Sequence, residues 1–259
     1  MTEERLNFVR PVLDTFENED IKEFATVLLD NLPEYIWHVG ASSTGKYHPA
    51  YSLGDGGLMR HQMAVVRFLN FFFELEQYNS KIASRERDLM RLAALVHDGR
   101  KSGSQEDYEK SKFTKFNHPI LMADVVRSYD GQYLNHEEIE VIANSISSHM
   151  GQWNTDKKSD VVLPKPNNGY AKLIHLADYL ASRKCLTMDF DEYIVPSSKV
   201  EFDENYTLSF GKHSGKKLID IYRSAPDYVR WMEENIHRPD LLNMIKAMKE
   251  HIKNQEDEI

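Results

Sequence analysis

Four histidines and two aspartates stand in apolar helical contexts, where an ionisable side chain is costly. They are His61, His97, Asp98, His118, His149 and Asp178. Burying such a group destabilises the fold unless the group is paired or binds a metal. A cation offsets that cost by holding imidazole nitrogen and carboxylate oxygen together. We therefore predict that the six residues form one metal site, with the adjacent pair His97 and Asp98 at its centre.

A single inward histidine is a weaker signal than the ordered set. Any one of these residues could instead be a hydrogen-bonded core residue. His175, three residues before Asp178, illustrates that alternative because it could cap a core network. The complete order is a histidine, then His-Asp, then two histidines and a late aspartate, each on a helix that faces the core. That order favours the ligand interpretation.

The spacing of apolar residues predicts the helices that must position these side chains. The helices expected to carry them span residues 58–77, 87–98, 118–129, 136–149 and 169–184. In the first helix, His61 lies one turn from Leu58 and one turn from Val65, so its imidazole should point inward. Residues 21–39 should also be helical, with a kink or a break at Pro33.

A change in character near residues 187–200 predicts a domain boundary. Short β-favouring runs follow, at residues 193–195, 200–202 and 206–210. Three helical pieces complete the chain, at residues 216–224, 226–235 and 239–253. We therefore expect a mainly α-helical protein with two domains: a helical bundle at residues 1–190 and a small α+β module at residues 191–259.

Composition limits the classes of partner and location. The chain has 259 residues and a formal net charge of -9, so long nucleic acid is not an obvious partner. A small anionic substrate is compatible with this charge, because bound cations reverse the sign of a local site. The single cysteine, Cys185, excludes an intrachain disulfide and favours a cytoplasmic location. The apolar cluster at residues 71–73 is far too short to span a membrane, and the oligomeric state is left open.

The motifs around the candidate ligands resemble those of the HD superfamily of metal-dependent phosphohydrolases. Gly56-Gly57-Leu58-Met59-Arg60-His61 is similar to the context of the family's first histidine, and Leu89 to Asp98 to the helix that ends in His-Asp. The family usually continues His-Asp-Ile-Gly-Lys, whereas this chain has Gly99-Arg100 before Lys101. The stretch from His175 to Leu180 is similar to the context of the last aspartate. The resemblance covers roughly residues 45–185.

The resemblance implies an HD-domain helical bundle and a set of metal ligands. His61, His97, Asp98 and Asp178 would hold a first divalent ion, and His118 with His149 would add a second that Asp98 bridges. The closest resemblance is to the HD domain of bacterial 3′→5′ exoribonucleases, through His48-Pro49-Ala50-Tyr51 and Ser147-Ser148-His149-Met150-Gly151. Such mixed nitrogen and oxygen sets accept Mn, Fe, Co, Ni or Zn, and Mg is less natural.

The resemblance also implies a catalytic role for Asp98 and Lys101, through a metal-activated water that attacks phosphorus. Lys101 would neutralise charge on the phosphoryl group. It lies within residues 99–116, whose polar and charged composition predicts a surface loop or lid. Arg60 and His48 are further candidates for phosphate contacts, or else solvated surface residues. Trp153 could form a base- or sugar-binding wall, or else be a buried core residue.

Residues 208–232 resemble a small module at the ends of some exonuclease-like and phage-type proteins. Its lysines could make a weak nucleic-acid contact, or could simply be a solvated cluster on a packed appendage. We therefore expect hydrolysis of phosphoester bonds in nucleotides or short oligonucleotides, with 3′→5′ exonuclease-like action. The alternative is a non-catalytic, metal-dependent nucleotide sensor.

Overall fold

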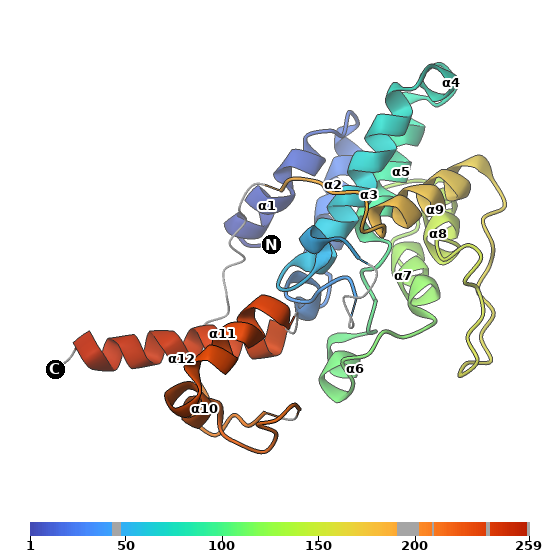
Figure 1. Cartoon of the computed structure of the whole chain (residues 1–259). Helices are drawn as coiled ribbons and strands as arrows, with labels where there is room; N and C mark the ends of the chain where they lie inside the picture. The colour runs from blue at the N-terminus through green and yellow to red at the C-terminus, as the bar shows by residue number, and fades with distance from the viewer. Residues whose placement is uncertain (43–47, 191–201, 209, 237–238, 258–259) are drawn as a thin grey trace. The chain divides into compact units, whose positions relative to one another are not determined.

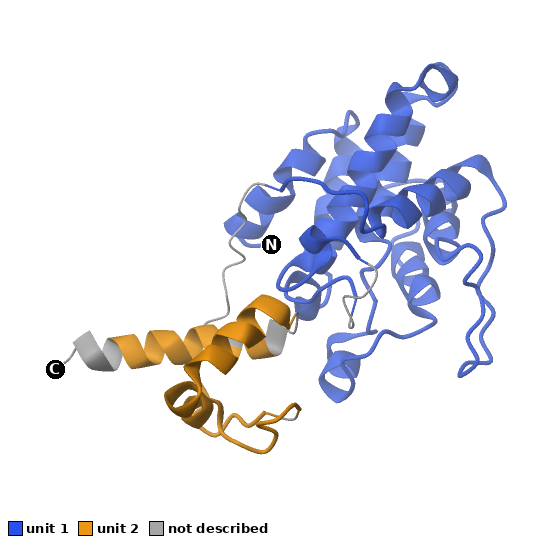
Figure 2. Cartoon of the chain, in the orientation of Figure 1, with its two compact units in different colours: residues 1–193 blue, residues 194–259 orange. Residues whose placement is uncertain are grey.

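A computed structural model describes the chain except for residues 43–47, 191–201, 209, 237–238 and 258–259. Contacts between Cα atoms divide the chain into two compact units, residues 1–193 and residues 194–259 (Figure 2). The described residues are mainly α-helical, as predicted for the chain as a whole, and in both units they contain isolated β-bridges but no β-sheet.

The first unit is a bundle of helices around a central helix, α3 (Figure 1). Its elements are α1 (Glu3–Leu13), α2 (Glu19–Asp30), η1 (Glu34–Trp37), η2 (Ala50–Ser52), α3 (Gly57–Glu74), α4 (Glu76–Asn79), α5 (Ser84–Val96), α6 (Gln105–Lys110), α7 (His118–Arg127), α8 (His136–Ser147) and α9 (Gly169–Ala181). Helix α3 packs against α5 and α9, α5 also packs against α2 and α8, and α7 packs against α8.

Local signals explain where several helices begin. The side chain of Asn135 accepts a hydrogen bond from the backbone N–H of Glu138 and caps α8, and the side chain of Glu138 accepts one from the backbone N–H of Asn135. Asn168 caps α9 by accepting from the N–H of Ala171. Pro33 separates α2 from η1, as its fixed φ predicts.

The expectation of a loop over residues 99–116 was wrong in part, because α6 forms inside it. Ser104 and Asp107 make a reciprocal cap, in which each side chain accepts from the other residue's backbone N–H. This local capping box begins a short helix without any apolar periodicity.

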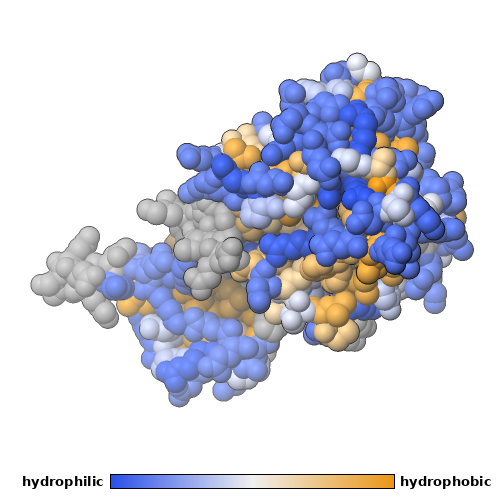
Figure 3. Space-filling model, turned by 90° about the horizontal axis from the view of Figure 1, so that it is seen from above, coloured by the Kyte–Doolittle hydropathy of each residue, from blue (hydrophilic) through white to orange (hydrophobic). Residues whose placement is uncertain are grey.

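One apolar core fills the first unit, and it includes fully buried residues of α2, α3 and α5 such as Phe24, Leu58 and Leu92. Most of the surface that Figure 3 shows is hydrophilic, with apolar side chains in smaller patches. Among the described residues, no helix combines the length and apolar character needed to cross a membrane.

The second unit contains α10 (Leu218–Ser224), α11 (Pro226–Asn235) and α12 (Pro239–Asp257) around a core of its own. Of the three expected β runs, residues 193–195 and most of 200–202 lie outside the described residues. In the third run, Thr207 forms a single antiparallel bridge with Lys217. The described β structure of this module is therefore one bridge. The chain enters α10 at Leu218, directly after Lys217, so no longer strand pair forms there.

Candidate metal centre

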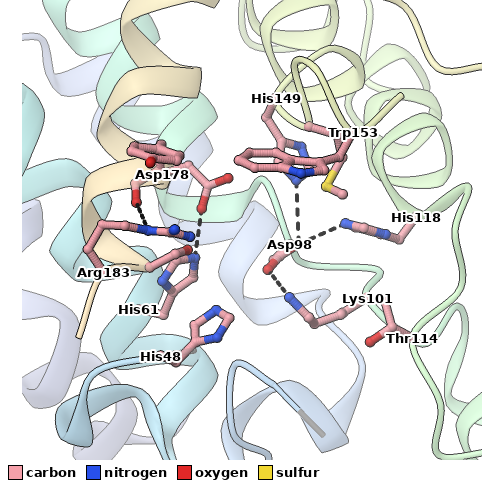
Figure 4. Close-up of a pocket in the computed structure, with 13 residues that line it drawn as sticks. His48, His61, Asp98, Lys101, Thr114, His118, His149, Trp153, Asp178 and Arg183 are labelled. Carbon is pink, nitrogen blue, oxygen red and sulfur yellow. Dashed lines mark hydrogen bonds and ion pairs between the residues drawn. The ribbon is translucent and has the colours of Figure 1, made fainter. Parts of the chain in front are cut away.

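The structure brings all six predicted ligand residues together from different elements (Figure 4). His61 comes from α3, and Asp178 from α9. His97 and Asp98 directly follow α5, His118 is the first residue of α7, and His149 lies just beyond the end of α8. The four histidines and Asp98 are buried, and Asp178 is half-buried.

Asp98 is the hub of the cluster. Its Oδ1 lies 2.9 Å from His118 Nε2 and 3.7 Å from His149 Nε2, and its Oδ2 lies 3.7 Å from His97 Nε2. The ammonium group of Lys101 forms an ion pair with the same Oδ2. The two oxygens of one carboxylate therefore face different sets of partners.

Asp178 joins the cluster from the opposite side. Its Oδ1 lies 3.0 Å from His61 Nε2 and 3.7 Å from His97 Nε2. Three overlapping trios have ligand atoms within 4.8 Å of one another: His61, His97 and Asp98; His97, His149 and Asp178; and Asp98, His118 and His149. Asp98 belongs to two of these trios, so the donor atoms suit two neighbouring ions that share it.

Backbone contacts fix the tautomer of three rings. The Nδ1 atoms of His97, His118 and His149 donate to carbonyl oxygens three residues earlier, over 2.8, 2.6 and 2.8 Å respectively. Since a carbonyl can only accept, the proton of a neutral ring sits on Nδ1 and the Nε2 lone pair is left free. The Nε2 of His97 has no hydrogen-bond partner among the described residues. Such an oriented, unprotonated nitrogen beside a carboxylate suits a metal ligand.

Burial and charge set the protonation states that ligands need. Burial lowers the pKa of His97, and it lowers the pKa of His149 to about 3, so both rings are neutral at pH 7. Burial alone would raise the pKa of Asp98, but the ammonium group of Lys101 beside it holds that pKa well below its usual value. Burial is the largest single influence on Asp178 and opposes its ionisation, but several contacts, led by the hydrogen bond to His61, together lower the pKa of Asp178. Neutral imidazoles and ionised carboxylates are the forms that bind a cation.

A cavity of about 420 Å³ opens over the cluster. Its lining includes His48, His61, Asp98, Lys101, Thr114, His118, His149, Met150, Trp153, Asp178, Tyr179, Ser182 and Arg183. His97 is fully buried and is not among the lining residues, but one of its ring nitrogens belongs to two of the three trios. Figure 4 shows Lys101, His118 and His149 around Asp98, with His61 beside Asp178.

Three of the four predicted substrate contacts line this cavity: Lys101, His48 and Trp153. Arg60 does not, and this expectation is corrected. Its guanidinium donates to the carbonyl oxygens of Tyr51, Leu53 (2.9 Å) and Asp55 (2.8 Å). Arg60 therefore clamps the segment that leads into α3, because its donors are used within the protein.

The aromatic wall of the cavity is a stack of side chains. Trp153 is 44% exposed and lies parallel to Tyr179, with ring centroids 5.8 Å apart. The guanidinium of Arg183 lies 4.3 Å from the centre of the Tyr179 ring. Sequence reasoning missed Arg183. The spacing of four residues between Tyr179 and Arg183 could have indicated this contact. Residues four apart lie on the same side of a helix, and Arg183 comes just after the end of α9.

Two buried side chains hold the turn that carries Asp98 and Lys101. Gln62 accepts a hydrogen bond from the backbone N–H of Asp98 over 3.2 Å. The Tyr35 hydroxyl accepts from the N–H of Ser102 and donates to the carbonyl of Gly103, both over 2.9 Å. Tyr35 is thus a positioning residue for this turn.

Tyr35→Phe should lower turnover about tenfold, the usual scale for outer contacts of a metal site. The substitution leaves the buried Ser102 N–H without its partner and frees the turn next to Lys101. Tyr133→Phe, which removes a hydroxyl from a ring stacked on Phe24, is the matched control. Steady-state kinetics of both variants check the effect, and equal turnover in the two would contradict a positioning role.

Comparison with known families agrees with this geometry. Residues 59–183 match the family model described as HD domain, and residues 208–237 match the model described as Exodeoxyribonuclease X-like C-terminal. All six ligand candidates and Lys101 lie inside the first match. No curated protein and no solved structure matched the chain.

Proposed function

With residues 59–183 assigned to the HD-domain superfamily, we propose that this chain is a metal-dependent phosphohydrolase. Its substrates are phosphoesters of nucleotides or short oligonucleotides, and its action is phosphodiesterase-like in the 3′→5′ direction. The observation that carries the proposal is the position of the Asp98 carboxylate in two of the three ligand trios. The activity belongs to residues 1–190 in this proposal, with residues 191–259 as a separate module.

The donor atoms fit two divalent ions. His61, His97, Asp98 and Asp178 would hold one, and Asp98, His118 and His149 would hold the other. The preponderance of imidazole favours Mn, Fe, Co, Ni or Zn over Mg. When bound, such ions supply Lewis-acid chemistry: they polarise phosphoryl oxygens and lower the pKa of a water molecule.

The protein's own cations complete the electrostatics of the cavity. Lys101 lies beside Asp98, and Arg183 lines the same cavity near Asp178. Two positive side chains that line this cavity would stabilise the charge that develops on the phosphoryl oxygens. The burial of Asp98 and His149 strengthens these interactions because little water screens them.

The aromatic wall supports a substrate that carries a base. A cavity of about 420 Å³ is in the range of small-molecule sites, and the half-exposed Trp153 offers a face on which a base can stack. The free Cys185 supports a cytoplasmic location as part of the proposal, since no disulfide would be needed.

Metal analysis and turnover test this function together. Protein from which a chelator has removed the metal should hydrolyse none of the compounds in a panel of mononucleotides, cyclic nucleotides, oligonucleotides and bis-p-nitrophenyl phosphate. Added Mn²⁺ should restore the activity. Wild-type protein should bind about two ions, and His118→Ala about one, because only one trio contains His118. His136→Ala, an exposed histidine at the start of α8, is the control and should keep both ions.

Two results would refute the proposal. Binding of nucleotide with metal present but no turnover across the panel would identify a sensor instead of an enzyme. An ion count in His118→Ala equal to that of the wild type would show that His118 holds no second ion, and would refute the two-ion site.

A further inference from the structure

A basic loop on the second unit is a local exception in an acidic protein. Residues 206–219 contain no acidic residue, although the whole chain has a net charge of -9. Lys212, Lys216 and Lys217 lie in this loop and are exposed. The Nζ of Lys217 donates to Asn205 Oδ1 over 2.9 Å, which leaves Lys212 and Lys216 as the cations available to a ligand.

A stacked pair of aromatic rings, a partly buried tyrosine and an exposed tryptophan, lies next to this loop. Tyr228 and Trp231 are on one face of α11 and stack with centroids 5.5 Å apart and planes 22° apart. Trp231 is 47% exposed. On the other side of the same helix, Val229 and Met232 are buried in the unit's own core. The folding of the unit therefore accounts for Val229 and Met232 but not for the exposure of Trp231.

The loop and the rings form one surface. The Lys212 ammonium lies 5.1 Å from the centre of the Tyr228 ring, and the His213 ring lies 4.7 Å from it. Gly211 has φ +70°, and a Cβ there would lie 2.4 Å from the Tyr228 hydroxyl oxygen. The glycine thus permits the close approach that brings Lys212 over the Tyr228 ring.

Backbone hydrogen bonds hold the loop in this shape. The N–H of Leu208 donates to the Lys216 carbonyl over 3.0 Å, and the N–H of Gly215 donates to the Leu208 carbonyl over 2.7 Å. Leu208 is itself buried in the core of the unit. The cations are therefore presented on a loop anchored to the core, which lowers the entropy cost of binding.

We propose that this surface, made by Lys212, His213, Lys216, Tyr228 and Trp231, binds single-stranded nucleic acid. The exposed ring of Trp231, backed by Tyr228, can accept the face of any unpaired base, and the neighbouring lysines can neutralise phosphates. Both faces of a base inside a duplex are covered by neighbouring bases, so such a base cannot stack on Trp231. The surface should therefore bind single strands more tightly than duplexes. This binding goes beyond the proposed hydrolysis, because it requires neither the metal ligands nor Asp98.

Fluorescence anisotropy with the full chain tests this directly. The probe is a fluorescein-labelled, mixed-sequence ten-nucleotide strand, as DNA and as RNA, in EDTA so that metal-dependent hydrolysis is absent. Trp231→Ala should raise Kd about tenfold, and Trp231→Phe should restore part of the affinity because it keeps a ring. Lys212→Ala should raise Kd several-fold and reduce the salt dependence by about one charge.

Matched controls separate this surface from general changes. Phe71→Ala removes an aromatic side chain that is 56% exposed on the first unit, and Lys172→Ala removes an exposed lysine of α9. Both should bind the strand as the wild type does. All variants should also hydrolyse bis-p-nitrophenyl phosphate at the wild-type rate, since that ester is too small to need the second unit.

The outcomes distinguish this proposal from the proposed function. Wild-type affinity in Trp231→Ala, or equal affinity for the strand and its duplex, would overturn the binding surface whatever the hydrolytic activity. Strand binding that depends on Trp231, in a chain that hydrolyses nothing, would support the surface while refuting the phosphohydrolase.

Discussion

Asp98→Asn should lower kcat by about 10³-fold or more and reduce the bound metal to less than one ion per chain. The carboxylate faces the Nε2 atoms of His97, His118 and His149 from its two oxygens. An amide keeps the shape but loses the negative charge, and one end becomes an N–H₂ donor that cannot bind a cation. A 10³-fold loss corresponds to about 4 kcal/mol of transition-state stabilisation.

The same substitution should leave the fold intact. Asparagine is nearly isosteric, and the backbone N–H of residue 98 still donates to Gln62. Removing a buried negative charge also leaves Lys101 without its ion-pair partner, so we expect a modest loss of stability and no global unfolding. Circular dichroism, metal content and kcat should be measured on the same preparation.

Asp124→Asn is the control for Asp98→Asn. Asp124 lies on α7 with 61% of its side chain exposed, paired with Arg127. That variant should keep wild-type metal content and turnover. If Asp98→Asn kept two ions and full turnover, the central role of its carboxylate would be wrong.

Local sequence explains the direction in which three of the candidate imidazole rings point. In His97, His118 and His149 the same contact recurs, from Nδ1 to the carbonyl oxygen three residues earlier. Each of these residues lies at a helix end, where nearby backbone geometry decides the ring direction. Their burial follows from the apolar spacing of the flanking residues. Helical periodicity and motif order were therefore enough to select the six side chains that the structure brings together.

Contacts between distant parts of the chain were not predictable in the same way. Tyr35 holds a turn 67 residues further along the chain, and nothing near Tyr35 in the sequence indicates that partner. Arg60 lies inside a family motif, but its side chain points to the segment before α3. The path of residues 51–55 brings three carbonyl oxygens to its guanidinium. Such assignments depend on the fold of loops, for which apolar spacing carries no signal.

Asp88 is another residue whose role comes from a distant contact. It lies in α5, the helix that leads into His97, and its side chain is fully buried. The carboxylate accepts from the backbone N–H groups of Glu17 and Asn18, both over 2.8 Å, and from the Asn18 side chain over 2.7 Å. Arg91, only 7% exposed, donates to it over 2.6 Å. One carboxylate thus fastens the start of α2 to α5.

Asp88→Ala should lower the free energy of unfolding by about 3–5 kcal/mol, because it leaves Arg91 as a buried charge without this partner. For a unit of this size, that loss corresponds to a fall in Tm of roughly 10 °C. Asp124→Ala is matched in residue type and in its spacing to an arginine, but its pair is exposed and should cost less than about 1 kcal/mol. Thermal and urea denaturation of both variants measure the difference.

The double variant Asp88→Ala/Arg91→Leu separates the buried charge from the lost hydrogen bonds. Leucine removes the cation while keeping apolar volume beside Phe73, whose ring lies 5.3 Å from the Arg91 guanidinium. If the unpaired charge dominates, the double variant should be more stable than Asp88→Ala alone. If it is equally unstable or less stable, the hydrogen bonds to Glu17 and Asn18 carry the effect, and the link from α2 to α5 is then the main contribution of Asp88.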